Sequence, residues 1–433
     1  MPLSFKELLD GYNFAKNGHR GKKCVRRFIF YLERELLTLE AELKENRYSP
    51  RPLRRFFIHK PKQRHVAESH FRDRVVHHAL TSVIEGPLVN HWVMQSYACR
   101  KGLGPIKAVK NFYRIITGWQ AFQETWVLKF DIKKYFDSIP HDRLIELLSN
   151  HPEVRPYLGL IQVILHHGSF EKGLPIGHLT SQFFANFYLN ELDRYLLHHL
   201  GCKNFFRYMD DILIIHHEKN FLLTLLGKVQ EFCSTQLKVE LHPRKIFLRP
   251  SADGIEFLGF LVRPASIQIK PSNLARIRRR LRSLNRQLLL GMESIETIRR
   301  RLVSWRGYAQ HGSSPKQFEA LVRWSARLRP DLHDLCRTLF LPRSLPQSLP
   351  HATGQQPVPK PTQQDGKTSH SVLCPWLLIH GTDESESAFF QVLQWSSQVK
   401  PHAETLTQWP ESPPQEPTAD PWKSFYPLCI YEF

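Results

Sequence analysis

The sequence lacks paired cysteines and long apolar stretches. Its seven cysteines are scattered singly, and no two form a Cys-x-x-Cys pair. An odd, dispersed set argues against a disulfide framework and favours a reduced, cytoplasmic protein. No apolar run approaches the roughly 18 residues that a bilayer-spanning helix needs. The first residues do not have the pattern of a signal peptide, so we expect no membrane association.

Acidic residues are scarce relative to basic ones. The chain of 433 residues has 60 lysines and arginines against 40 aspartates and glutamates, which gives a formal net charge of +20. Such an excess favours a polyanionic partner and steers it electrostatically. Charge alone does not distinguish RNA from DNA or from a membrane surface.

Two adjacent aspartates stand out against this basic background. Asp210 and Asp211 lie at the break between two short apolar runs, which predicts two strands joined by a tight turn. Neighbouring carboxylates are costly to bury unless a cation compensates them. Mg²⁺ prefers such hard oxygen ligands together with substrate phosphates. The pattern points to phosphoryl-transfer chemistry, and the alternative is a solvated hairpin.

A second acid site lies upstream. Asp131 ends an apolar strand that begins at Trp126, and Pro140 then opens a helix. Asp137 is interpreted as a helix-entry or turn residue.

Between the two acid sites, a loop rich in glycine and hydroxyl groups runs over residues 173–182 into a predicted helix. Thr180 or Ser181 would cap that helix, and Gly177 would let the backbone approach a ligand closely.

These elements together resemble the palm of a reverse transcriptase. Motif A surrounds Asp131, motif B contains Gly177, and motif C is the Tyr-Met-Asp-Asp sequence of residues 208–211. The resemblance implies an α+β right-hand polymerase fold with fingers, a helical thumb and a palm whose antiparallel βαββαβ sheet has helices on one face. The implied domains are N-terminal helices and fingers (1–125), palm (126–264) and thumb (265–340). After the thumb, prolines interleaved with serine, glutamine and glycine indicate a linker (341–368), and an aromatic C-terminal segment of unknown fold follows (369–433).

The resemblance also implies a two-metal site for nucleotidyl transfer. Two Mg²⁺ ions, with Mn²⁺ as an alternative, would be held by Asp131, Ile132, Asp210 and Asp211. Lys245, by its position in motif D, would help to protonate the leaving pyrophosphate, and the alternative for it is an ordinary surface position. The residues implied in binding nucleotide or template are Lys62, Arg64, Arg72, Phe136, Ile176, Gly177, Gln182 and Tyr208.

Two of these substrate assignments have alternatives. Lys62 and Arg64 belong to a basic fingers hairpin that would touch the triphosphate, although phosphates of the template backbone would attract the same residues. Phe136 lies five residues after Asp131, the position of the steric gate in this family. A bulky ring there would clash with a ribose 2′-hydroxyl and select deoxynucleotides, whereas the alternative role for Phe136 is core packing.

Motif B narrows the resemblance to a subfamily. Ile176 precedes Gly177, and Gln182 follows Ser181, which resembles the reverse transcriptases of diversity-generating retroelements. Those bacterial or phage-encoded enzymes copy a template RNA with errors opposite adenine, and the implied partners are template RNA, primer or cDNA, deoxynucleoside triphosphates and a small basic accessory protein. Ile176 cannot hydrogen-bond the template or nucleotide as glutamine could. The alternatives are an antiphage-defence or group II intron-like reverse transcriptase, and an inactive RNA-binding protein.

The remaining expectations concern helices. Apolar residues at helical spacing predict one amphipathic helix over residues 25–43, and His77 and His78 are interpreted as helix-surface residues. The segment 271–305 is helical in pattern and carries six arginines between Arg276 and Arg286 without interspersed acids. We expect these arginines to contact nucleic-acid phosphates rather than only solvent.

Overall fold

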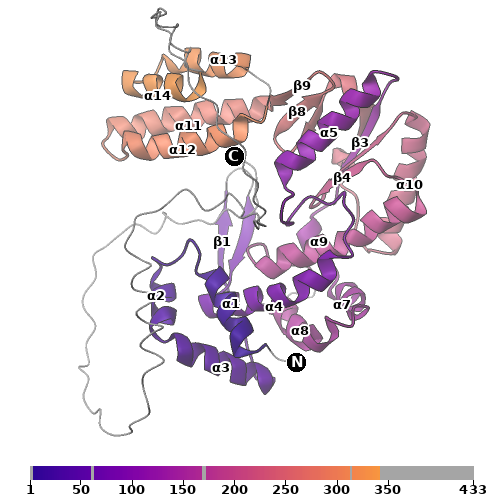
Figure 1. The fold of residues 1–433 in the computed structure, drawn as a ribbon, viewed down its shortest axis with the longest axis vertical. Coiled ribbons are helices and arrows are strands. Elements are labelled where there is room, and N and C mark those ends of the chain that lie inside the picture. The colour runs from indigo at the N-terminus through magenta and orange to yellow at the C-terminus, as the bar shows by residue number, and fades with distance from the viewer. Residues whose placement is uncertain (1–2, 60–62, 168–171, 313–314, 342–433) are drawn as a thin grey trace, which may run out of the picture. The chain divides into compact units, whose positions relative to one another are not determined.

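The computed structural model describes residues 3–59, 63–167, 172–312 and 315–341 (Figure 1). Lys62 and the predicted C-terminal segment 369–433 lie outside these ranges, as does all but the first residue of the predicted linker. The described elements include both helices and antiparallel strands, so the α+β prediction is confirmed.

Four helices form the N-terminal region, and α1 lies across α4 (Figure 1). A capping box between Ser4 and Glu7 starts α1. The predicted single helix over 25–43 is wrong, because Tyr31 has φ −113° and ψ +29° and separates α2 from α3. The helices are α1 (Phe5–Ala15), α2 (Lys23–Phe30), α3 (Leu32–Lys44) and α4 (Phe71–Val89).

The fingers contribute a two-stranded hairpin and a helix. Strands β1 (Arg54–Ile58) and β2 (Arg64–Glu68) pair antiparallel, with Phe56 opposite Val66. Helix α5 (Pro105–Gln120) then leads into the palm. Its N-terminal proline sits where a missing N–H costs nothing.

The palm is a four-stranded sheet in the order β4-β5-β3-β6, and every neighbouring pair is antiparallel. Helices separate β3 from β4, and α10 separates β5 from β6, so the chain follows the predicted βαββαβ order. The strands are β3 (Trp126–Asp131), β4 (Phe205–Tyr208), β5 (Asp211–His216) and β6 (Phe247–Pro250). The helices are α6 (Tyr135–Ser138), α7 (His141–Ser149), α8 (Leu158–His166), α9 (Leu179–Arg194) and α10 (Lys219–Thr235).

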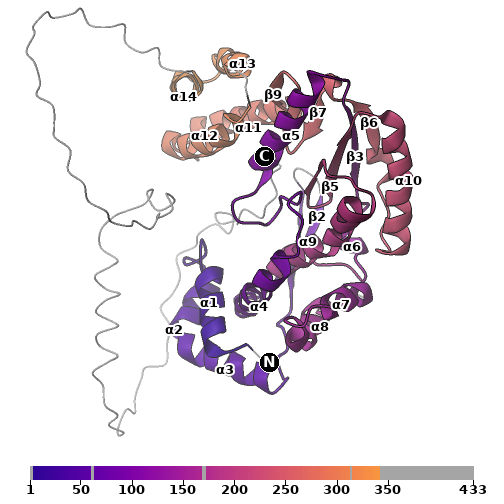
Figure 2. The same ribbon diagram turned by 45° about the vertical axis from the view of Figure 1, so that its right-hand side comes forward.

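Both faces of the palm sheet are buried, which corrects the expectation of helices on one face only. Successive strand residues point to opposite faces. Leu128 and Ile214 join a core shared with α9 and α10, whereas Val127 and Ile215 join a second core shared with α5. Burial on two sides explains why these strands read as continuous apolar runs rather than alternating ones. Figure 2 shows α10 against the sheet and α5 beside the strands.

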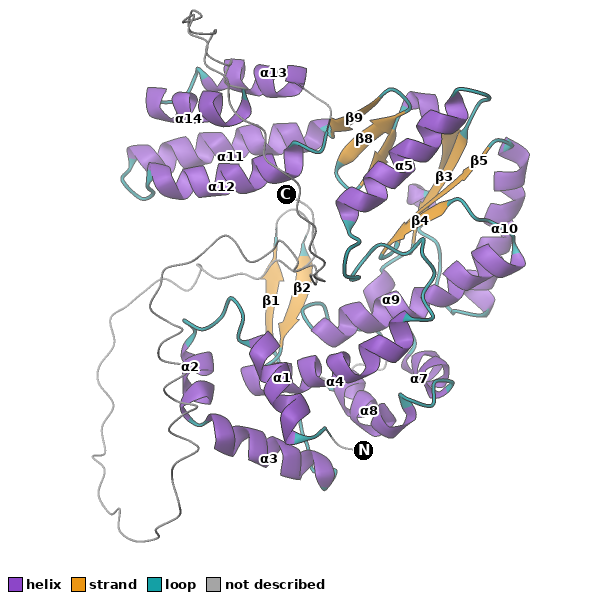
Figure 3. Cartoon of the chain, in the orientation of Figure 1, coloured by secondary structure: helices purple, strands orange, loops and turns teal. Residues whose placement is uncertain are grey.

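A second sheet and four helices complete the described chain. Figure 3 shows β8 and β9 apart from the palm strands and from the β1–β2 hairpin. The side chain of Gln317 donates to the Ile269 carbonyl and accepts from its amide, both at 3.0 Å, which ties the helices to this sheet. The elements are β7 (Ile255–Phe257), β8 (Phe260–Arg263), β9 (Ser266–Ile269), α11 (Pro271–Leu289), α12 (Ile295–Ala309), α13 (Pro315–Ser325) and α14 (Pro330–Phe340).

The predicted thumb segment 265–340 begins with strand β9, and its described residues from Pro271 onward form α11 to α14. Helix α11 buries Ile277, Leu281 and Leu284. None of the helices in the described part of the chain is long and apolar enough to cross a membrane.

Gly11 allows α1 to pack closely against α4, and this contact predicts an effect on stability. A β-carbon at residue 11 would lie 2.5 Å from the Val75 carbonyl oxygen. We expect Gly11→Ala to lower the free energy of unfolding by about 1–3 kcal/mol through overpacking. Gly118→Ala is the matched control, since Gly118 lies in α5 with nothing within 4 Å of the added carbon. That variant should gain roughly 0.5–1 kcal/mol. Urea denaturation measures both, and a Gly11→Ala protein as stable as the native one would contradict the packing argument.

Candidate active site

The three candidate acids meet at one end of the palm sheet. The antiparallel register of β3 and β5 places Asp131 directly opposite Asp211. Tyr208 pairs with Asp211 across the β4–β5 hairpin, so Met209 and Asp210 form its two-residue turn. Met209 adopts φ +54°, a left-handed conformation that is uncommon for residues other than glycine. Residues far apart in sequence thus present three carboxylates within one small region.

Two lysines balance the outer carboxylates. The Lys245 Nζ lies 2.5 Å from Asp131 Oδ2, and the Lys129 Nζ lies 3.0 Å from Asp211 Oδ1. Lys129 also donates to the Glu256 carbonyl at 2.8 Å, which links the site to β7. Lys245 thus contacts a site carboxylate with a side chain that is 42% exposed, and its role in motif D stays a prediction.

Burial and mutual repulsion change the protonation of the acids. Burial, together with the nearby charge of Asp131, raises the pKa of Asp210 to about 6. Burial also raises the pKa of Asp211, and the adjacent Lys129 opposes this rise. A buried carboxylate with a raised pKa is typical of functional sites, and a bound cation would stabilise its ionised form.

The donor set of the site suits a hard divalent cation, since carboxylate oxygens are the ligands that Mg²⁺ prefers. Within the described ranges, no three histidine, cysteine, aspartate or glutamate side chains already surround a common point at metal-ligand spacing. Asp131 and Asp211 are instead paired with ammonium groups. The Ile132 side chain is a hydrocarbon buried in the core, so only its backbone carbonyl oxygen could bind a metal.

Motif B contacts the fingers hairpin through its backbone. The Ala67 amide donates to the Ile176 carbonyl at 2.9 Å, and Gly177 has φ +124°. A β-carbon at residue 177 would lie 2.6 Å from the Ala67 carbonyl oxygen. The glycine therefore allows β2 to approach closely, and the expected approach of its backbone to a ligand stays a prediction.

A cavity of about 240 Å³ adjoins this contact between the hairpin and motif B. Ile176 lines it together with His65 from β2 and Asp137 from α6. Asp137 is exposed in that short helix, in agreement with its interpretation as a helix-entry residue. Phe136 is half-buried beside it, and its ring contacts Tyr135 edge to face.

Three expectations around the fingers are wrong. Arg72 is buried, and its guanidinium donates to Glu42 at 2.5 Å, so it holds α4 to α3 and is not free to bind a substrate. His77 is also buried rather than on the helix surface, and its Nδ1 lies 2.9 Å from Thr180 Oγ1. Helix α9 begins at Leu179 without a side-chain cap from Thr180 or Ser181.

The other predicted residues lie on defined elements. Arg64 begins β2, Gln182 lies in the first turn of α9, and Tyr208 ends β4. Their roles toward a substrate stay predictions.

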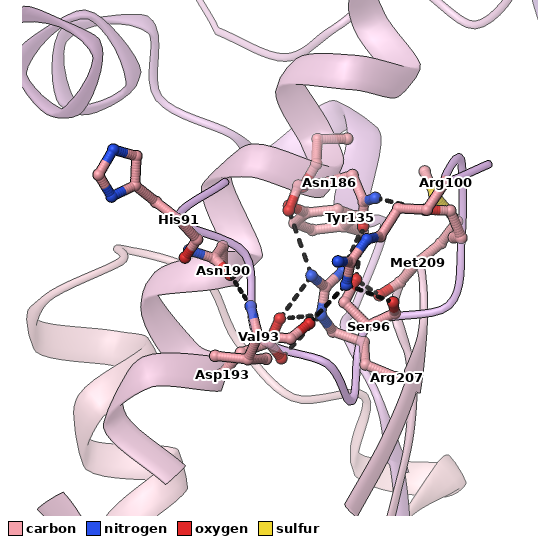
Figure 4. A network of polar contacts seen from close by, with 12 residues as sticks. His91, Val93, Ser96, Arg100, Tyr135, Asn186, Asn190, Asp193, Arg207 and Met209 are labelled. Atoms are coloured by element: carbon pink, nitrogen blue, oxygen red, sulfur yellow. Dashed lines mark hydrogen bonds and ion pairs between the residues drawn. The ribbon is translucent and has the colours of Figure 1, made fainter. Parts of the chain in front are cut away.

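Sequence reasoning missed a buried polar network next to the acids. Arg207 lies on β4 with no exposed surface, and its guanidinium contacts Asp193 and Asn186 of α9 (Figure 4). The available signal was an arginine between aromatic residues in a predicted strand. An arginine is almost never fully buried unless it is paired, so this pattern indicates a buried acidic partner.

Comparisons with known proteins agree with this geometry. Residues 58–262 match the family model described as reverse transcriptase (RNA-dependent DNA polymerase).

The relatives among curated proteins include proteins encoded in introns. A 91 kDa protein in the cob intron of Schizosaccharomyces pombe is 32% identical over 36% of this chain and 20% of its own length. The group II intron-encoded protein LtrA of Lactococcus lactis is 28% identical over 39% of this chain and 29% of its own length. The chain thus spans less than a third of either protein.

Among solved structures, the telomerase of Candida albicans in complex with a TWJ fragment of telomeric RNA aligns with a TM-score of 0.44 and 10% identity. The alignment covers 69% of this chain and 57% of the telomerase chain.

The raised pKa of Asp210 predicts a stability effect. Below about pH 4 the carboxyl is protonated in both the folded and the unfolded state, and its burial costs little. Above about pH 6 it is ionised in both, and the folded state bears the cost of the buried charge. Asp210→Asn should therefore raise the free energy of unfolding by about 1–3 kcal/mol at pH 7.5 and by less at pH 4.5.

Urea denaturation without divalent metal at the two pH values measures this difference. Asp253→Asn is the matched control, because it removes an exposed carboxylate outside the site and should change the free energy of unfolding by less than about 0.5 kcal/mol at pH 7.5. A loss of stability for Asp210→Asn at pH 7.5 would show that burial of this charge is not costly.

Proposed function

We propose that this chain is an RNA-directed DNA polymerase that extends a primer by metal-assisted nucleotidyl transfer. The observation that carries the proposal is the convergence of Asp131, Asp210 and Asp211 at one sheet end, inside a segment that matches the reverse transcriptase family model. The net charge of +20 supports a nucleic acid template and primer as partners. Deoxynucleoside triphosphates would be the substrates.

Magnesium is the proposed cofactor, with manganese as an alternative. Asp131, Asp210 and Asp211 would hold two ions, and Ile132 could contribute its carbonyl oxygen. When bound, the metal lowers the pKa of the primer hydroxyl and neutralises charge on the triphosphate. The ammonium groups of Lys245 and Lys129 now balance two of these carboxylates. Binding of cations would take over that compensation.

The residues of the chain itself would orient substrate and move a proton. Lys245 already lies at Asp131, and its side chain is 42% exposed, so it can turn toward a leaving pyrophosphate and donate a proton there. Phe136 would exclude a ribose 2′-hydroxyl. Arg64 would contact phosphates from the fingers hairpin. Most of the rate enhancement would come from positioning and charge stabilisation.

Primer extension tests this proposal. The full chain, given a DNA primer on an RNA template, deoxynucleotides and Mg²⁺, should extend the primer. Asp210→Ala should lower the rate at least about 1,000-fold, because charge stabilisation by a metal supplies several kcal/mol. Asp253→Ala is the control, since Asp253 is an exposed residue outside the site, and it should stay within about twofold.

Absence of extension by the native chain on both RNA and DNA templates would contradict the polymerase proposal. If native and Asp210→Ala proteins then bound RNA equally, the inactive RNA-binding alternative would replace it.

We further propose that the enzyme is of the diversity-generating retroelement type and copies its template RNA with errors. The support is the pair Ile176 and Gln182 in motif B, together with the position of Ile176 at the cavity beside the fingers hairpin. An aliphatic side chain offers no hydrogen bond with which to check a base pair, so geometric discrimination would be looser. A small basic accessory protein would be a further partner.

A group II intron-like reverse transcriptase is the second candidate. The specific observation in its favour is that the relatives named above include a group II intron-encoded protein. An antiphage-defence enzyme has no specific observation in its favour.

Fidelity separates the two candidates. Ile176→Gln should lower misincorporation opposite template adenine by about tenfold, which corresponds to roughly 1.4 kcal/mol from one added hydrogen bond. Sequencing of cDNA made from one defined RNA template measures the error at each base. Errors opposite template uracil serve as the internal control and should change less. Equal accuracy of both enzymes opposite adenine would remove Ile176 as the source of infidelity.

A further inference from the structure

Arg207 is a charged residue in the interior of the protein. It lies on β4 opposite Ile212, and neither its side chain nor that of Asp193 has exposed surface. The flanking residues Phe206 and Tyr208 face the core shared with α5, so Arg207 points to the opposite side of the sheet, toward α9. Figure 4 shows its guanidinium surrounded by groups from α9, from residues 93–100 and from the motif C turn.

Helix α9 supplies the charged partner and most of the hydrogen bonds of the guanidinium. Its Nε lies 2.8 and 2.7 Å from the two carboxylate oxygens of Asp193, and its Nη1 donates to Asn186 Oδ1 at 2.6 Å. Its Nη2 also contacts Asp193 at 2.5 Å. The charge is thus neutralised and hydrogen-bonded, as burial requires. Such an ion pair is nevertheless weak evidence for stability, because apolar residues of similar volume often do as well.

One contact of Arg207 leads directly to the candidate site. Its Nη1 also donates to the Met209 carbonyl at 3.2 Å. Met209 has a left-handed backbone without being glycine, and its carbonyl belongs to the peptide bond that begins Asp210. A strained conformation persists only where its surroundings fix it. The hydrogen bond from Arg207 is one such restraint.

The same arginine is held from the other side by the fingers connection. The Arg207 amide donates to the Gln95 carbonyl, and the Arg207 carbonyl accepts from the Tyr97 amide, both at 2.9 Å. The Asn186 side chain donates to the Ala98 carbonyl at 2.7 Å. Arg207 is therefore fixed against two other segments and is a rigid donor for the turn.

We propose that Arg207 is a positioning residue that sets the place of Asp210 by holding the Met209 carbonyl in the turn of motif C. This inference rests on the proposed polymerase function. It assigns to Arg207 no contact with substrate or metal. Its effect is on the rate of the chemical step rather than on nucleotide binding, since only the placement of one carboxylate depends on it.

Single-turnover primer extension with Arg207→Lys tests the proposal. Lysine keeps the charge beside Asp193 but lacks the fork that reaches Asn186 and Met209 together. The maximal extension rate should fall about 10- to 100-fold, as displacement of a catalytic group by about 1 Å does, with the apparent nucleotide Kd within about twofold. Adding Met209→Gly should recover at least about tenfold in rate, because glycine adopts positive φ without help.

A purely structural role predicts a different pattern. Met209→Gly with Arg207 retained measures the change in Tm that the glycine causes by itself, through relief of the positive φ and added backbone freedom. Recovery of rate in the Arg207→Lys protein, with a change in Tm no larger than in that reference, supports positioning. An unchanged rate in Arg207→Lys, or no recovery with Met209→Gly, overturns it. Absence of extension by the native chain would instead overturn the proposed function.

A second pair of variants decides the matter if Arg207→Lys does not fold. With Arg207 retained, Met209→Val disfavours the left-handed conformation, whereas Met209→Gly favours it. The valine variant should extend primers at least about tenfold more slowly than the glycine variant, because the valine displaces the neighbouring Asp210 carboxylate. Equal rates for the two variants would overturn the proposal.

Discussion

The antiparallel pairing of β3 with β5 is the constraint on which the site depends. Its register places Asp131 opposite Asp211, and a slip by one residue would turn every side chain of one strand to the other face. Such a slip is opposed on both sides of the sheet. Leu128 and Ile214 belong to one core, and Val127 and Ile215 belong to the other. The apolar residues of the strands therefore hold the acids in place.

Bringing carboxylates together opposes folding, and the surrounding chain offsets that cost. Lys245 comes from the segment before β6, and Lys129 comes from β3 itself. Each neutralises one outer acid. Asp210 has the raised pKa of about 6 that burial beside another acid produces. Asp131 and Asp211, the two acids that lysines neutralise, stand on strands, whereas Asp210 lies in the tight turn between β4 and β5.

The sequence allowed the order of the palm elements and the three acids to be predicted, because both follow from local patterns. Apolar runs that end in an acid mark strand ends, and helical spacing marks the thumb segment. Arg72 and His77 were misplaced for a different reason. Their partners, Glu42 and Thr180, lie 30 and 103 residues away in the chain, and no local pattern encodes such contacts. Arg207 was missed because its counter-ion lies on a separate helix.

Gly177 shows how a correct motif can have an unexpected physical cause. Its positive φ and lack of a side chain serve the approach of β2, and the adjacent Ile176 carbonyl accepts from Ala67. The backbone of motif B and the fingers hairpin are therefore one hydrogen-bonded unit. Within that unit the Ile176 side chain lines the cavity while its backbone is fixed. A change of side chain at residue 176 acts on the chemistry of that cavity without moving the loop, whereas a β-carbon at residue 177 would separate the two elements.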